Sequence, residues 1–269
     1  MSFISFRRLS RTTTTTLGAL ALLSLAGSAQ AAFFSFASDD DSSQFTFRGT
    51  AGSGSSFTIS NGRSPSTTPV TLKIDDNNGA LPTVSLDVGF LADMTVRWEG
   101  SVGVAGSQTH VYSVLGSFSF VNDAGAPLLT GTFNNANTPA VMTVFGSMTN
   151  WGSAGSIFGS DTVSGFAGAV TWTATAELIA LANSQSINLA QYGIVAGSSA
   201  APDDFAFTLT DLNAANANVP IDSMSRLPTA AWQSEGSFSG SAVNGIPSPS
   251  GAVALVGAAG LILAGRRRR

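Results

Sequence analysis

The sequence predicts an all-β fold: a single antiparallel β-sandwich or jelly-roll-like domain, with an N-terminal signal helix and a C-terminal transmembrane helix. Two properties of the composition and one of the residue pattern lead to this class. Hydrophobic residues make up 43% of the 269 residues, whereas charged residues make up only 10%, against about 25% in typical domains. Surface helices normally carry many charged side chains, so this composition favours strands and turns. Along most of the chain, apolar and polar residues alternate with a period of two.

Residues 1–31 are typical of a secretory signal peptide. Three arginines, Arg7, Arg8 and Arg11, precede the uncharged apolar stretch 17–26, and Ala29-Gln30-Ala31 supplies a small-x-small cleavage pattern. The apolar stretch is too short to cross about 30 Å of hydrocarbon as a permanent helix. We therefore expect the export machinery to recognise this segment and signal peptidase to cut after Ala31.

Residues 32–233 are predicted to form the extracellular β domain. Turn residues such as Asn61-Gly62, 122–125 and Asn134-Asn135 separate its alternating runs. One helix is predicted within 177–192. The predicted strands contain Phe45 and Phe47, then 70–74, 84–90, 94–98, 113–121, 140–148, 168–178 and 205–211.

The charge distribution argues against a nucleic-acid partner. All 16 acidic residues lie between the arginine-rich ends, together with only five basic ones, Arg48, Arg63, Lys73, Arg97 and Arg226. Such an acidic body repels phosphate backbones.

No nucleophilic or zinc site is recognisable. The chain has no cysteine and a single histidine, His110, whereas serine nucleophiles usually need a histidine base and zinc needs several His or Cys ligands. There is also no G-x-S-x-G motif. We interpret His110 as an exposed strand histidine, and we predict no enzymatic activity and no cofactor.

Two other chemistries depend on carboxylates. A pair of carboxylates could hydrolyse a glycosidic bond, but no motif brings two of them together, and Asp87 and Asp93 are expected on wet strand faces. The carboxylates considered are Asp87, Asp93, Glu99, Glu177 and Glu235. For calcium, which needs six to eight oxygens, the candidate ligands are Asp75, Asp76 and Asn77; an acidic run, Asp39-Asp40-Asp41, offers further oxygens. A hairpin turn at 75–79 and a solvated start at 39–41 are the alternative interpretations.

The C-terminal part reads as a linker followed by a membrane segment. Residues 234–245 are rich in Gly and Ser and are predicted to be a flexible linker. From Ile246 the chain has about 20 uncharged residues, enough for about 30 Å of helix. Four arginines end the chain, namely Arg266, Arg267, Arg268 and Arg269. The positive-inside rule places them in the cytoplasm and the body outside.

This tail, 246–269, resembles the PEP-CTERM sorting signal of bacteria with an outer membrane. Ile246-Pro247-Ser248-Pro249 matches the two prolines of the family's motif, with Ser248 in place of its glutamate, and the apolar helix and arginine cluster follow in the family's order. The resemblance implies an exosortase-like membrane enzyme as processing partner. It also implies a transient anchor in the inner membrane, followed by delivery to the outer surface or the extracellular matrix.

We therefore expect an exported, non-enzymatic cell-surface or matrix protein. One alternative is a carbohydrate-binding module for extracellular polysaccharide, with Trp151 or Trp232 as stacking platforms and Trp98 and Trp172 in the core. A second alternative is an exported hydrolase without a recognisable site.

Overall fold

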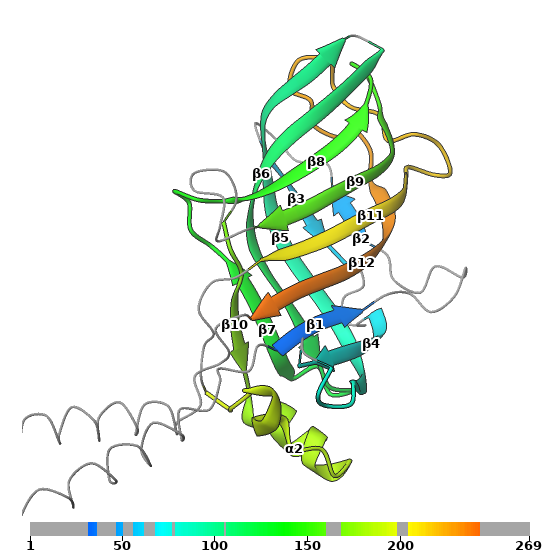
Figure 1. The fold of residues 1–269 in the computed structure, drawn as a ribbon. Coiled ribbons are helices and arrows are strands. Elements are labelled where there is room, and N and C mark those ends of the chain that lie inside the picture. Colours follow the sequence, from blue (N-terminus) through cyan, green and yellow to red (C-terminus); the bar gives the residue numbers. More distant parts are fainter. Residues whose placement is uncertain are drawn as a thin grey trace, which may run out of the picture. The chain divides into compact units, whose positions relative to one another are not determined.

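The computed structural model describes residues 32–36, 47–50, 56–61, 68–76, 79–104, 106–159, 168–197 and 204–242, all within one compact unit, Ala29–Ser248. These residues form a single sheet of 12 strands (Figure 1), and every pairing between the strands is antiparallel. The strands are β1 (Ala32–Phe36), β2 (Phe47–Thr50), β3 (Ser56–Ser60), β4 (Thr68–Asp75), β5 (Val84–Val104), β6 (Ser107–Val121), β7 (Pro127–Phe133), β8 (Ala140–Gly146), β9 (Trp151–Gly159), β10 (Thr171–Ala174), β11 (Phe205–Asn213) and β12 (Trp232–Ala242). The predicted all-β, antiparallel class is confirmed.

The sheet closes on itself. β12 pairs with β11 on one side and with both β1 and β2 on the other, and β5 pairs with β6 on one side and with both β4 and β3 on the other. Two routes therefore lead from β5 to β12, one through β4 and β1 and one through β3 and β2. The circuit is completed by β6, β8, β9 and β11, while β7 and β10 branch from β6. Closure leaves fewer strand edges free to pair with other chains.

The structure differs from the predicted sandwich or jelly roll in this continuity. The reason lies in β5 and β6, which are 21 and 15 residues long. They pair with each other from Gly89↔Val121 to Val104↔Ser107. On the edge that faces away from the other, each pairs with two shorter strands: β5 with β4 and β3, and β6 with β7 and β8. The hydrogen-bond ladder is therefore continuous, whereas in a sandwich it would be divided between two sheets.

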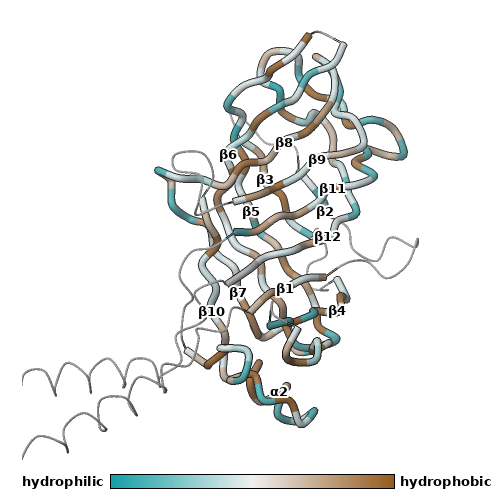
Figure 2. Tube along the Cα trace, in the orientation of Figure 1, coloured by the Kyte–Doolittle hydropathy of each residue, from teal (hydrophilic) through white to brown (hydrophobic). Residues whose placement is uncertain are grey.

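The predicted alternation is confirmed in the strands that carry it. In β4, Val70, Leu72 and Ile74 are buried while the residues between them are not. Hydropathy alternates along the trace in the same way (Figure 2). Successive side chains of a strand point to opposite faces, so one face of the closed sheet packs the core and the other meets solvent.

Aromatic side chains fill the core in two clusters. The larger cluster includes Phe36, Phe90, Phe118, Phe120, Phe207, Phe238 and Trp172, with Phe207 and Phe238 only 4.8 Å apart between ring centroids. The smaller cluster consists of Phe57, Tyr112, Trp151 and Trp232, with 5.2 Å between the two tryptophan rings. Each such pair contributes about 0.5–1.5 kcal/mol beyond its buried area.

The predicted linker 234–245 is corrected by β12, which includes residues 234–242. Several of its inward positions are occupied by small residues: Ser234, Gly236 and Gly240 are buried at the positions that alternate with Trp232 and Phe238 along the same face. A Cβ at Gly240 would lie 2.7 Å from the ring of Phe238 and 3.0 Å from that of Trp172. Small residues are needed here because large rings from the same core occupy the space, so a buried strand has the composition of a linker.

The predicted helix within 177–192 is present but divided. The α-helix α2 (Ala176–Ser184) begins after Thr175, whose side chain accepts a hydrogen bond from Leu178 N, and the 3-10 helix η1 (Leu189–Tyr192) follows. Between them Ser186 has a φ of 63°, which an α-helix does not accommodate. Thr175 Oγ1 also lies 3.0 Å from Pro127 O and 3.1 Å from Leu128 O, and donating its one hydrogen to either carbonyl ties α2 to β7.

The signal peptide 1–31 and the tail 246–269 lie outside the described residues. Among the residues that the structure does describe, no helix has both the length and the apolar character required to cross a membrane.

Candidate functional site

A polar groove of about 370 Å³ lies across β9, β11 and β12 and the turn that follows β11. β9 contributes Ser153, β11 contributes Asp211 and Asn213, and β12 contributes Gln233 and Glu235; Asn216 and Asn218 come from the turn. Among the residues that the structure describes, no aromatic side chain lines it. Hydroxyl, amide and carboxylate groups from three strands therefore meet in one recess.

A β-bulge in β11 lies in the lining of this groove. Thr210 pairs with Glu235 and Asn213 with Gln233, so Asp211 and Leu212 together face the single residue Ser234. The extra residue shifts the alternation: Thr210 and Asp211 are both exposed, and Leu212 returns to the core. Asp211 has a φ of 48°, a conformation that Asp tolerates better than most residues. Bulges of this kind re-aim side chains and are common beside binding sites.

The side chains of Ser234 and Asn213 hold the bulge in place through hydrogen bonds. Ser234 Oγ lies 2.8 Å from Thr210 O and 2.6 Å from Glu235 O, and its single hydroxyl hydrogen is donated to one of them at a time. Asn213 Nδ2 donates to Asp211 O over 2.7 Å, and Asn213 Oδ1 accepts from Asn216 N over 3.3 Å. The side chain of Asn213 is thus committed to positioning the turn.

Other polar groups of the groove face outward without a partner in the described part of the chain. These are the carboxylate of Asp211, the hydroxyl of Ser153 and the side-chain amides of Asn216 and Asn218. Their donors and acceptors are hydrated in the free protein and can be exchanged for those of a ligand. Within the described residues, no group of three or more His, Cys, Asp or Glu side chains is arranged to hold a metal ion.

His110 is buried, which corrects its interpretation as an exposed strand residue. Its accessible surface is 0%. β6 lies between β5 and β8, which carry Ser101 and Val144 opposite His110. His110 is in phase with Tyr112 and Val114, which are buried on the same strand, so the alternation within β6 itself indicates its burial.

Hydrogen bonds define the state of His110. Its Nε2 is 2.9 Å from Ser147 O, a carbonyl that can only accept, so Nε2 carries the proton. Nδ1 then accepts from Ser101 Oγ at 2.7 Å, and Ser101 Oγ accepts from Trp98 Nε1 at 3.3 Å. Burial, with a smaller contribution from the Arg226 cation, lowers the pKa of His110, although the bond to Ser147 opposes this. The imidazole is a neutral structural link that does not line the groove.

The tryptophans proposed as stacking platforms are also buried. Trp151 and Trp232 are 0% and 2% exposed, so neither can stack on a sugar, and this part of the carbohydrate prediction is wrong. Trp151 Nε1 donates to Tyr112 Oη, which donates to Arg226 O over 2.7 Å. Trp172 is buried as predicted, whereas Trp98 is only partly buried.

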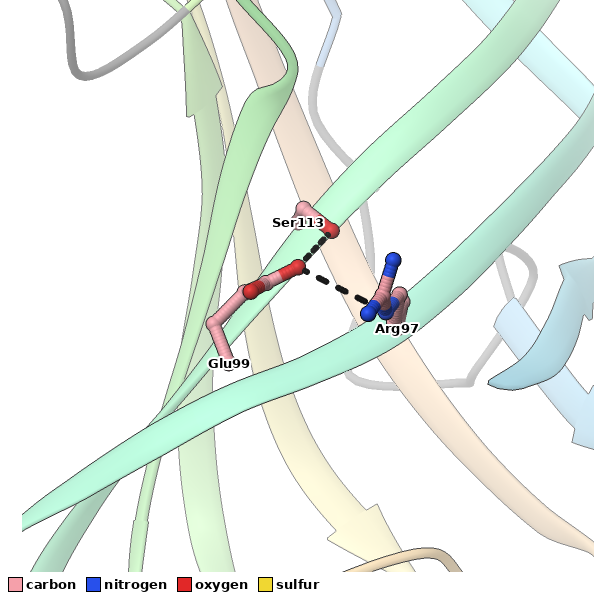
Figure 3. A network of polar contacts seen from close by, with 3 residues as sticks. All are labelled: Arg97, Glu99 and Ser113. Atoms are coloured by element: carbon pink, nitrogen blue, oxygen red, sulfur yellow. Dashed lines mark hydrogen bonds and ion pairs between the residues drawn. The ribbon is translucent and has the colours of Figure 1, made fainter. Parts of the chain in front are cut away.

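The predicted carboxylates are mostly separate surface groups. Asp87 and Asp93 are exposed, as expected. Glu99 is exposed and accepts from Ser113 Oγ at 2.7 Å, and it lies 4.0 Å from Arg97 Nε; Figure 3 shows the three side chains pointing toward one another. Exposed ion pairs of this kind contribute about 0–1 kcal/mol.

Glu177 is exposed at the start of α2. Only Glu235 shares a groove with a second carboxylate, that of Asp211, which the sequence did not single out. The signal that could have found it is the change of phase in β11, where buried residues move from odd positions (205, 207, 209) to Leu212.

The calcium candidates form a loop between β4 and β5. Asp76 is fully buried, and its two oxygens accept from the backbone N–H groups of Gly79, Ala80 and Leu81 at 2.8–3.0 Å. Asp75 accepts from Thr83 Oγ1 and from Asp76 N. These bonds support the turn interpretation of 75–79, because they occupy the oxygens that an ion would need.

Several predicted residues lie outside the described part of the chain. They are Asn77, the acidic run Asp39-Asp40-Asp41, the cleavage residues Ala29 and Ala31, the motif 246–249 and the arginine cluster 266–269.

No family model matches the chain, and no curated protein or solved structure shows significant similarity to it. Its function is therefore inferred from its own residues.

Proposed function

We propose that this chain is an exported, non-enzymatic protein of the cell surface or extracellular matrix, delivered by a removable C-terminal sorting signal. One observation carries the proposal: the sheet fits between the two predicted processing segments. The described strands run from Ala32 of β1, which follows the predicted signal cleavage site, to Ala242 of β12, which precedes the motif that begins at Ile246. Cutting at either end would leave every described strand whole.

The pairing of β1 with β12 supports the same proposal. Ala32 pairs with Ala242 and Phe36 with Phe238, so the first and last described strands along the chain are neighbours in the sheet. The mature domain would thus be held together by its own first and last strands, and the signal and the tail would act only in transport. The inferred partners are the export machinery, signal peptidase and an exosortase-like enzyme.

The test is mass spectrometry of the C-terminus of the surface protein. We expect wild-type protein to lack the tail, and a variant with Pro247→Ala and Pro249→Ala to accumulate as an uncut, membrane-bound precursor. Proline disfavours helix at the residue before it, so Pro-Ser-Pro keeps the junction extended and accessible to a protease. A surface protein that still ends at Arg269 would show that the tail is a permanent anchor.

The second candidate function is a carbohydrate-binding module. Its aromatic platforms at Trp151 and Trp232 are excluded by burial, and the observation that favours it is the polar groove on β9, β11 and β12.

A further inference from the structure

We propose that the groove between Ser153, Asp211 and Asn218 binds a saccharide, and that it selects neutral or amine-bearing sugars over anionic ones. The proposal rests on the second candidate function and names its site. The groove's volume, about 370 Å³, is at the small end of the range of about 300–1,000 Å³ for ligand sites. A short stretch of a polysaccharide fits this size better than an extended chain.

The chemistry of the lining indicates hydroxyl-rich ligands. The Ser153 hydroxyl and the Asn216 and Asn218 amides offer donors and acceptors together, and the Asp211 carboxylate offers acceptors only. Sugar hydroxyls both donate and accept, so they can pair with all of these groups. Recognition would depend on hydrogen bonds, since no aromatic ring of the described residues lines the groove.

The charges of the groove set its selectivity. Asp211 and Glu235 both line the groove, and among the described residues no lysine, arginine or histidine lines it. A uronate or sulfated sugar would meet like charge there, whereas a protonated amino group would gain a charge-assisted hydrogen bond. The order of affinity expected is amine-bearing, then neutral, then anionic.

The groove is also built to keep its shape. Asp211 is held by the bulge, and the turn is held by Asn213 and by the backbone bridge between Ala214 and Ala217, whose N–H and C=O groups bond each other at 2.8 and 3.1 Å. A binding group fixed on strands loses less conformational entropy when a ligand is bound than one on a mobile loop.

Isothermal titration of the full chain in mild detergent tests the proposal. The probes are a chitosan oligomer, cellohexaose and an oligogalacturonate. We expect the first two to bind and the third not to bind. Asp211→Asn should lower the affinity for the chitosan oligomer about tenfold or more, because a hydrogen bond to a charged group is lost. Asn suits the positive φ of this position, so the fold is retained.

Ser153→Ala, on a different strand, should weaken binding of both oligomers about two- to tenfold. Asp93→Asn is the matched control, since it removes an exposed carboxylate from β5 and should leave both affinities unchanged. EDTA should also leave them unchanged.

Each contrary result refutes a specific part of the proposal. Binding that survives Asp211→Asn and Ser153→Ala would exclude this groove and leave the carbohydrate-binding function standing. Equal loss in Asp93→Asn would show a non-specific charge effect, and loss in EDTA would show metal-mediated binding; either result refutes the proposal. No binding of any probe refutes both the groove and the second candidate function, whereas the tail-processing test stays independent. Shortened oligomers after incubation would show hydrolysis instead of binding alone.

Discussion

The effect of single side chains on the stability of this protein is clearest at His110. The buried, neutral imidazole connects β5, β6 and the β8–β9 turn through Ser101 and Ser147. Protonation would have to reverse the hydrogen bond with Ser101 and place a cation in the core near Arg226. Because protonating His110 costs free energy in the folded protein, the free energy of unfolding depends on pH.

We predict that the wild-type protein loses stability as the pH falls from 7 to 5. The pKa of His110 in the folded protein lies below 6.5, its ordinary value. The unfolded chain therefore binds the proton first, and stability falls from about pH 6.5 down to the folded pKa, below which the loss is complete. Melting temperatures measured across this range should fall further for the wild type than for His110→Gln. Since His110 is the only histidine, parallel curves for the two proteins would contradict the prediction.

A glycine decides the packing of the smaller aromatic cluster. Gly49 of β2 faces Trp232, and a Cβ at Gly49 would lie 1.8 Å from Trp232 Cε2, far inside van der Waals contact. Trp232 is itself packed against Trp151 and Phe57, so it cannot move without disturbing their rings.

We predict that Gly49→Ala destabilises the protein by about 1–3 kcal/mol, as overpacked cores generally do. Urea unfolding monitored by tryptophan fluorescence measures the change. Gly100→Ala is the control, because a Cβ at Gly100 meets no atom within 4 Å. Similar losses in both variants would show that backbone entropy, and not the tryptophan contact, sets the cost.

At the scale of elements, the loop between β4 and β5 is organised by one carboxylate. Asp76 gathers three backbone N–H groups, and Tyr192 of η1 donates to Pro82 O of the same loop over 2.6 Å. Burial, together with the carboxylates of Asp76 and Asp75, raises the pKa of Tyr192. The loop is thus fixed both from within and from η1.

We predict that Asp76→Ala costs about 1–3 kcal/mol, because buried N–H groups lose their acceptor. Thermal melting measures the loss, with the exposed Asp93→Ala as control. EDTA should leave the melting temperature of the wild type unchanged, since N–H groups already occupy both oxygens of Asp76. A shift in EDTA that disappears in Asp76→Ala would instead establish a calcium site.

At the scale of the molecule, the closed circuit makes the last strand indispensable. β12 pairs with β1, β2 and β11, so its removal would open the sheet along two lines and expose the rings around Phe238. All described strands of the circuit lie between Ala32 and Ala242.

We predict that residues 32–245 fold alone into a β-protein with one cooperative melting transition, whereas residues 32–233 do not. The shorter chain keeps Trp232 but lacks Phe238 and the pairing of β12 with β1. Circular dichroism and calorimetry of the two chains are the measurements. A cooperative transition of 32–233 would show that β12 after residue 233 is dispensable.

The sequence by itself determined the features that depend on local alternation and local turns. These are the antiparallel all-β class, the strands with apolar residues at every second position, the helix that begins near Glu177, and the exposure of Asp87 and Asp93. The physical reason is that the period of two reports burial directly when large apolar residues occupy the inward face.

The tertiary structure decided what depends on partners distant in the chain. β12 and β9 were not recognisable as strands, because their inward glycines owe their place to rings of other strands, such as Trp172 at Gly240 and Phe205 at Gly159. The burial of His110, Trp151 and Trp232 follows from closure of the sheet around them. The groove exists because a bulge in β11 turns Asp211 outward beside β12. The sequence shows the shift of phase at Leu212, but it does not show that β12 is the strand that pairs with β11 there.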